Sequence, residues 1–175
     1  YRVNWSKVEF TNNIDDIEHP IVREALRLFQ IDFPIEITTF SDIPGSTGLG
    51  SSSAFCVGLV HALHALKGKY ASKGSLATTA GKIEVDILKR TMGKQDHFAS
   101  AYGDLNIFTF NSNETINSEP VFYSNDVKNK LEQNLMLFYT GLKRDASEIL
   151  KSQDKATENK RAVLTQMRDL VYPLH

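Results

Sequence analysis

The residues best suited to chemistry form a glycine- and serine-rich segment, Pro44-Gly45-Ser46-Thr47-Gly48-Leu49-Gly50-Ser51-Ser52-Ser53. Its glycines allow the backbone to turn tightly and to approach a ligand closely. The serine hydroxyls can bind phosphate oxygens or a metal ion. The first amides of a helix that follows are unpaired donors at the positive end of the helix dipole. The segment therefore predicts an anion-binding loop, most simply one for phosphate.

Other glycine-rich loops fit this segment less well. A Walker A loop has lysine directly after its last glycine, whereas Gly50 is followed by serine. The third glycine of a dinucleotide-binding fingerprint would fall on Ser53. The remaining alternative is a strand-to-helix turn whose serines only cap the helix.

An acidic residue falls on the apolar side of a second predicted helix, which runs from Ser75 as N-cap to about Thr91. At 100° per residue, Glu84 lies within the arc formed by Leu76, Ala77, Ala80, Ile83, Ile87 and Leu88. A buried acid is costly unless it is paired or bound to a metal. Glu84 is therefore a candidate Mg²⁺ ligand that faces the loop. The alternative is an edge residue that reaches solvent or caps another helix.

A second acid, Asp96, lies at the predicted start of a third helix, after Gly93-Lys94-Gln95. There it could orient or deprotonate a hydroxyl nucleophile, as a base does in phosphoryl transfer. The alternative is a helix cap. The neighbouring His97 is interpreted as a packing residue. His61 and His64 are interpreted as core or edge histidines because no carboxylate clusters with them.

Alternating helices and strands position these residues. We predict a helix over 20–30, a strand over 34–40 and a buried helix from the loop to Leu66. Farther along, we predict strands over 105–110 and 134–139, a loop over 111–119 and a helix from Asp145 to about Val171. The pattern is mixed α and β, and it predicts a domain boundary in the polar loop over 111–119.

Composition and charge exclude several function classes. The 175 residues are 41% hydrophobic and 23% charged, which is typical of globular proteins. Lys and Arg number 20 against 21 Asp and Glu, with no basic stripe, so nucleic-acid binding is not expected. No apolar stretch is long enough to span a membrane. A single cysteine, Cys56, fits a reducing compartment, so we expect a cytoplasmic protein. We expect further segments to adjoin both ends of this sequence.

The motif Pro44-x-x-x-Gly48-Leu49-Gly50-Ser51-Ser52-Ser53-Ala54 resembles the GHMP kinases, which include galactokinase, homoserine kinase and mevalonate kinase. Ile83-Glu84, Gly93-Lys94-Gln95-Asp96-His97-Phe98 and Phe138-Tyr139-Thr140-Gly141-x-x-Arg144 resemble the heptose 7-phosphate kinase branch. This resemblance implies an α+β fold with two domains, 1–118 and 119–175. The N-terminal domain would be like domain 2 of ribosomal protein S5 and the C-terminal domain ferredoxin-like. We expect both ends to be incomplete, because the family's N-terminal substrate motif and C-terminal glycine-rich motif are absent.

The same resemblance implies roles for individual residues. The loop from Pro44 to Ser53 would surround the phosphates of ATP, and Ser52 and Glu84 would bind Mg²⁺. Asp96 would be the catalytic acid that accepts or steers the proton of the substrate hydroxyl. The residues expected near the sugar or its phosphate are Gln95, Thr140 and Arg144.

The implied function is transfer of the γ-phosphoryl group of ATP to a sugar, with the anomeric hydroxyl of a heptose 7-phosphate as the expected acceptor. The implied partner is a small molecule, with no nucleic acid or membrane, and a homodimer is compatible with it. One alternative is a galactokinase- or mevalonate kinase-like enzyme. Another is a nucleotide- or sugar-binding protein without catalysis.

Overall fold

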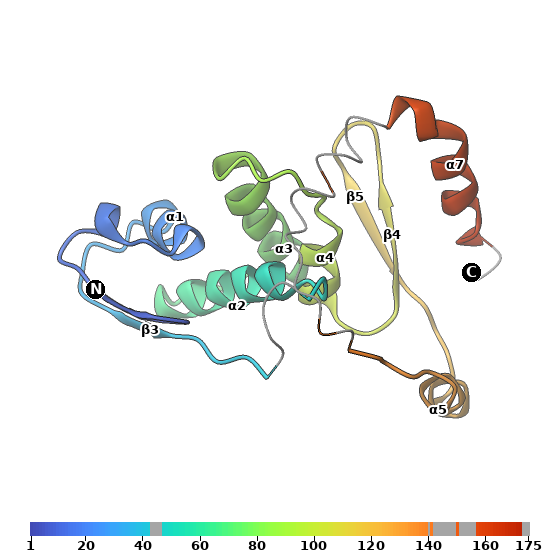
Figure 1. The fold of residues 1–175 in the computed structure, drawn as a ribbon, viewed down its shortest axis with the longest axis horizontal. Helices are drawn as coiled ribbons and strands as arrows, with labels where there is room; N and C mark the ends of the chain where they lie inside the picture. The colour runs from blue at the N-terminus through green and yellow to red at the C-terminus, as the bar shows by residue number, and fades with distance from the viewer. Residues whose placement is uncertain (43–46, 140, 142–149, 151–156, 173–175) are drawn as a thin grey trace. The chain divides into compact units, whose positions relative to one another are not determined.

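The computed structural model describes residues 1–42, 47–139, 141, 150 and 157–172 (Figure 1). The chain divides into two compact units, Tyr1–Tyr102 and Gly103–His175. Every candidate site residue that the structure describes lies in the first unit. The domain boundary expected at residue 118 stays a prediction.

A three-stranded sheet opens the first unit, with strand β1 (Arg2–Asn4) at its centre. Strand β2 (Val8–Phe10) pairs with β1 antiparallel, and strand β3 (Glu36–Thr38) pairs with it parallel. Helix α1 (Pro20–Leu28) packs against this sheet, and its buried side chains share a core with Val3. The predicted helix over 20–30 and strand over 34–40 are thus confirmed in shorter form.

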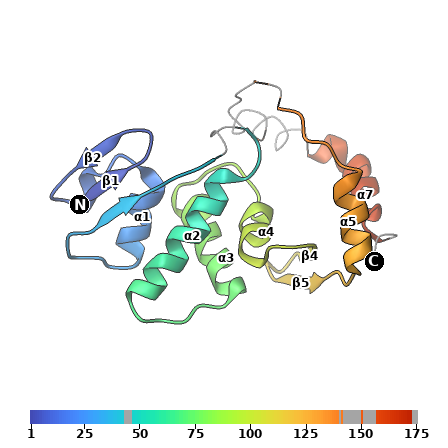
Figure 2. The same ribbon diagram turned by 90° about the horizontal axis from the view of Figure 1, so that it is seen from below.

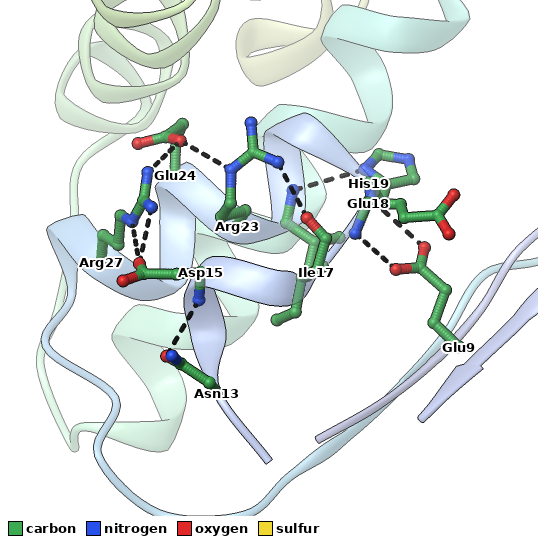
Figure 3. Close-up of polar contacts among 10 residues, drawn as sticks. Glu9, Asn13, Asp15, Ile17, Glu18, His19, Arg23, Glu24 and Arg27 are labelled. Carbon is green, nitrogen blue, oxygen red and sulfur yellow. Dashed lines mark hydrogen bonds and ion pairs between the residues drawn. The ribbon is translucent and has the colours of Figure 1, made fainter. Parts of the chain in front are cut away.

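The start of α1 is fixed by a buried carboxylate in β2 (Figure 3). Glu9 accepts the backbone N–H groups of Glu18 at 2.5 Å and His19 at 3.2 Å. His19 is the N-cap, and its Nδ1 accepts the N–H of Val22 at 3.3 Å. Because unpaired amides at a helix start need acceptors, these contacts determine where α1 begins relative to the sheet. A short 3₁₀ turn, η1 (Ile14–Asp16), precedes it.

Helix α2 (Ser51–Leu66) directly follows the glycine-rich loop, as predicted. Its core face includes Cys56, Val60 and Leu63. The prediction that this helix is central and buried is correct for that face and wrong for the opposite one, which is exposed along Ala54, Gly58, His61, Ala62 and Ala65. Most of those side chains are small, so the helix exposes little apolar area there. His61 is exposed, and His64 packs edge-on against Phe29.

Helix α3 (Lys73–Gly81) lies beside α2 (Figure 2). It is capped by Ser72, whose Oγ accepts the N–H of Ser75 at 3.2 Å, so it begins before the predicted cap. It continues as a π-helical segment, η2 (Lys82–Ile87), and ends before the predicted Thr91. A π turn holds more residues than an α turn and rotates the side chains that follow it. For this reason Ile87 is 38% exposed although the 100° pattern predicts it to be buried.

The second unit opens with a hairpin of strands β4 (Asn106–Phe110) and β5 (Ile116–Pro120). Strand β4 confirms the predicted strand over 105–110. The predicted loop over 111–119 is wrong in its second half, since β5 is a polar strand that pairs through its backbone. Asp104, which precedes the hairpin, has a left-handed φ of 57°, a conformation that Asp tolerates better than most residues.

Helix α5 (Asn125–Gln133) follows the hairpin, and the turn η3 (Glu158–Lys160) leads into helix α7 (Arg161–Asp169). The predicted buried strand over 134–139 is wrong. This segment is exposed and has no strand partner among the described residues, so its apolar side chains have nothing to pack on there. The first part of the helix predicted from Asp145 lies outside the described residues.

Candidate active site

The described part of the glycine-rich loop, residues 47–53, leads into the start of α2. Pro44, Gly45 and Ser46 lie outside the described residues. Gly48 and Gly50 have left-handed φ angles of 77° and 69°, which an L side chain rarely adopts. Gly50 is the N-cap of α2 and has no side chain to pair with the amides of the first turn. The cap of this helix is therefore not a serine.

The other loop residues lie around this helix start. Leu49 is exposed, Thr47 is half-buried, and Ser51 and Ser52 are half-buried in the first turn. Ser53 is buried, and its Oγ has no hydrogen-bond partner within the described part of the chain. The serines thus point in different directions, and Ser52 has the contact of most interest.

Ser52 contacts the predicted acid directly. Its Oγ donates a hydrogen bond to Oε1 of Glu84 at 2.5 Å, and the Glu84 side chain is fully buried. The prediction that Glu84 lies on the buried face is confirmed, and the alternative of a solvent-reaching edge residue is wrong. The loop and the π segment therefore bring together a hydroxyl and a carboxylate that are far apart in the sequence.

A third residue, Arg90, completes this cluster. Its Nη1 atom donates to Oε1 of Glu84 at 2.5 Å and to Oγ of Ser52 at 2.8 Å. The chain reaches it by a tight reversal in which Lys89 has a φ of 53° and the Arg90 N–H donates to the carbonyl of Glu84 at 3.0 Å. One cationic nitrogen atom thus contacts both candidate ligand oxygens.

The sequence prediction missed Arg90. On a regular helix, a residue six positions after Glu84 lies about 240° around the axis and points away from it. The π segment and the reversal at Lys89 bring it back. The available signal was the rule that a buried acid needs a counter-charge, which makes each nearby cation a candidate partner.

The other oxygen of Glu84 contacts His97, which is also fully buried. The Nε2 atom of His97 lies 2.9 Å from Oε2 of Glu84. Its Nδ1 has no hydrogen-bond partner within the residues that the structure describes. His97 is therefore a hydrogen-bonding partner that fixes the carboxylate from behind, and the interpretation of simple packing is wrong.

These contacts determine the charge of Glu84. Burial raises its pKa, but the hydrogen bonds from His97 and Ser52 and the charge of Arg90 lower it more. The net pKa is below the ordinary value for a glutamic acid, so the group is a carboxylate at neutral pH. A buried anion of this kind needs a counter-charge, and Arg90 supplies it on the side on which Ser52 lies.

Asp96 lies beside the start of α2. It is the second residue of helix α4 (Gln95–Tyr102), which packs against α2 and α3 (Figures 1 and 2). A β-carbon placed on Gly50 would lie 3.3 Å from Oδ2 of Asp96. Asp96 is exposed and lies within the helix, so the carboxylate is accessible from solvent.

The predicted substrate residues are only partly described. Gln95 is the exposed first residue of α4, next to Asp96. Thr140 and Arg144 lie outside the described residues. The structure thus brings together Gly50, Ser52, Glu84 and Asp96, and adds Arg90 and His97 to the predicted set.

The chemistry of this cluster suits a phosphorylated ligand and a hard cation. Hydroxyl and carboxylate oxygens are ligands that Mg²⁺ prefers, and it usually binds one or two of them together with water and phosphate. No group of three His, Cys, Asp or Glu residues that could bind a metal occurs within the described ranges. Among the described helices, none is both long and apolar enough to cross a membrane.

Comparison with known proteins finds a family match over part of the chain. Residues 20–104 match the family model of the GHMP kinases N-terminal domain. The chain is 31% identical over 111 residues to D-glycero-alpha-D-manno-heptose 7-phosphate kinase of Campylobacter jejuni. It is 33% identical over 84 residues to mevalonate kinase of Methanothermobacter thermautotrophicus. These alignments cover 63% and 48% of this chain.

The fold agrees with that of a solved structure. The crystal structure of a D-glycero-D-manno-heptose 1-phosphate kinase from Bacteriodes thetaiotaomicron matches 91% of this chain with a TM-score of 0.69 at 23% identity. The match covers 56% of that chain. The alignments with the two curated relatives cover 33% and 27% of their lengths. The mixed helix and strand fold predicted from the sequence is thus confirmed.

Proposed function

We propose that this chain, whose residues 20–104 match the N-terminal domain of the GHMP kinases, serves ATP-dependent phosphorylation of a sugar. The proposed acceptor is the anomeric hydroxyl of a heptose 7-phosphate. The name of the relative from Campylobacter jejuni, a heptose 7-phosphate kinase, supports this choice. The proposed setting is a cytoplasmic protein with a second, ferredoxin-like domain from residue 119 and a homodimeric assembly.

One observation carries the proposal. Ser52 Oγ and Glu84 Oε1 lie 2.5 Å apart, and a cationic nitrogen already contacts both oxygens. The guanidinium of Arg90 is a stand-in for a cation, so the donor set fits Mg²⁺. Ser52 and Glu84 are the residues that would hold it. When bound, Mg²⁺ would neutralise charge on the phosphates of ATP.

The other residues act on the nucleotide and the acceptor. The loop from Pro44 to Ser53 would surround the phosphates, and the amides at the start of α2 would donate to their oxygens. Asp96 would accept a hydrogen bond from the acceptor hydroxyl and orient it for in-line attack, taking its proton as the new bond forms. His97 holds the Glu84 carboxylate in place.

The approach of Asp96 to Gly50 supports this division of roles. A β-carbon on Gly50 would lie only 3.3 Å from Oδ2 of Asp96. The proposed base therefore lies at the edge of the phosphate loop. A hydroxyl held by Asp96 would therefore lie next to phosphates held by α2. Gln95, Thr140 and Arg144 are proposed to contact the sugar or its phosphate.

The test measures Mg²⁺-dependent ADP release with a panel of acceptors: heptose 7-phosphate, galactose and mevalonate. We expect ADP release that depends on heptose 7-phosphate. We also expect the ³¹P spectrum of the product to show a sugar 1,7-bisphosphate. Release with galactose or mevalonate alone would show another GHMP kinase specificity. ATP binding without transfer to any acceptor would show a binding protein without catalysis and would contradict the proposal.

A further inference from the structure

Arg90 occupies the position where a cation would bind, and this has a consequence for how the site is filled. Its Nη1 atom is 2.5 Å from Glu84 Oε1 and 2.8 Å from Ser52 Oγ. These two oxygen atoms are the ones that the proposed function assigns to Mg²⁺. On this side of the oxygen pair, the guanidinium and a metal ion cannot both be in contact with them.

The two partners of this ion pair differ in their access to solvent. The Glu84 side chain is fully buried, whereas 36% of the Arg90 side chain is exposed. The acid therefore cannot leave the site without carrying a charge through the core, but the arginine can leave by rotating its side chain into water. An exchange of counter-charges would thus move Arg90 and leave Glu84 in place.

The backbone supports the same asymmetry. Glu84 lies within the π-helical segment η2 and is held from behind by His97 at 2.9 Å. Arg90 lies after the end of this segment, beyond the left-handed turn at Lys89. One side chain is attached to a packed helix and the other to a connecting segment.

We propose that Arg90 is a displaceable counter-charge, which neutralises Glu84 when the site lacks metal and is expelled from Ser52 and Glu84 by the divalent cation. This inference rests on the proposed function. It makes Arg90 a positioning residue that keeps Ser52 and Glu84 together in the metal-free protein. It also predicts that Arg90 competes with the metal and lowers its apparent affinity.

The test is a titration of the nucleotide-free chain with Mn²⁺, in which the free ion is measured by electron paramagnetic resonance. Arg90→Gln should tighten Mn²⁺ binding by about fivefold or more, the factor that corresponds to removing about 1 kcal/mol of competing interaction. The matched control is Lys89→Gln. It removes one positive charge from the same turn but none of the contacts that Arg90 makes with Ser52 and Glu84. It should change the dissociation constant by less than about twofold.

Two further variants keep the outcomes distinct. Arg90→Lys retains the charge, and we expect it to bind Mn²⁺ with wild-type or intermediate affinity. If circular dichroism shows that Arg90→Gln is unfolded, Arg90→Lys takes its place in the comparison. In that case, weaker Mn²⁺ binding by Arg90→Lys than by wild type would contradict the proposal. Glu84→Gln should abolish the binding.

The proposal is overturned if Arg90→Gln binds Mn²⁺ no more tightly than wild type, or if Lys89→Gln tightens binding equally. In both cases loss of binding in Glu84→Gln would leave the metal site of the proposed function intact. If Glu84→Gln binds as wild type does, the metal site itself is wrong and this inference fails with it.

Discussion

The carboxylate of Asp96 lies so close to Gly50 that a β-carbon on this glycine would be 3.3 Å from Oδ2. Gly50 also has a left-handed φ of 69°. The backbone angle therefore favours glycine at the N-cap of α2, and any β-carbon there would push the Asp96 carboxylate aside by a few tenths of an ångström. The same contact places the proposed base beside the proposed phosphate site.

A first prediction concerns this glycine. Gly50→Ala should lower the free energy of unfolding by about 1–2 kcal/mol because an L residue is strained in the left-handed region. It should also displace Asp96. The matched control is Gly58→Ala in the middle of the same helix, where a β-carbon meets no atom within 4 Å. That variant should be more stable by about 0.5–1 kcal/mol. Urea unfolding measures both, and equal effects would contradict the account.

A second prediction concerns Asp96 itself. Asp96→Asn keeps the size of the side chain and removes its basicity. We expect nucleotide binding to remain within about twofold of wild type, whereas turnover with the accepted sugar falls by about a hundredfold or more. Calorimetric titration and an ADP-release assay separate the two effects. Near-wild-type turnover would remove Asp96 from the mechanism.

A third prediction concerns pH and Glu84. Its pKa in the folded protein is lowered, although burial alone would raise it, because contacts with His97, Ser52 and Arg90 favour the carboxylate. A group with a lowered folded pKa adds stability above its unfolded pKa of about 4.3, and this is lost as pH falls through the folded pKa. Wild type should therefore lose stability relative to Glu84→Gln between pH 6 and pH 3. Parallel urea-unfolding profiles for the two proteins would contradict this cause.

A fourth prediction concerns His97. His97→Leu leaves Oε2 of Glu84 without its partner in a buried site, and should destabilise the protein by about 1–3 kcal/mol. The matched control is His61→Leu on the exposed face of α2, which should change stability by less than about 0.5 kcal/mol. Thermal or urea unfolding gives both values. A result in which the two substitutions cost the same would show that the His97 contact has no energetic role.

Much of this site follows from the sequence, since periodicity and spacing are enough to predict it. The 100° pattern places Glu84 on the buried face, and the loop spacing places Ser52 at the start of a helix. The helix that carries Asp96 begins where Gly93 and the polar residues after it predict. These features depend on local pattern, and the structure confirms them.

The contacts that could not be predicted depend on departures from regular structure. Arg90 reaches Glu84 only because a π segment and a left-handed residue, Lys89, redirect the chain. Strands β1 and β2 hold three residues each, too few to show a period. Strand β5 is polar and pairs through its backbone, so its side chains give no signal. Hydrophobic periodicity predicts which residues are buried, but it does not predict which residues a buried group contacts.

The most direct measurement of the central claim is calorimetric titration of the chain with a non-hydrolysable ATP analogue, with and without Mg²⁺. The account predicts one saturable site whose affinity rises by about tenfold or more with Mg²⁺. It also predicts that Glu84→Gln loses this gain while its metal-free affinity stays unchanged. Binding that is the same with and without Mg²⁺, or a gain that survives Glu84→Gln, would contradict the assignment of Ser52 and Glu84 as the cation site of a kinase.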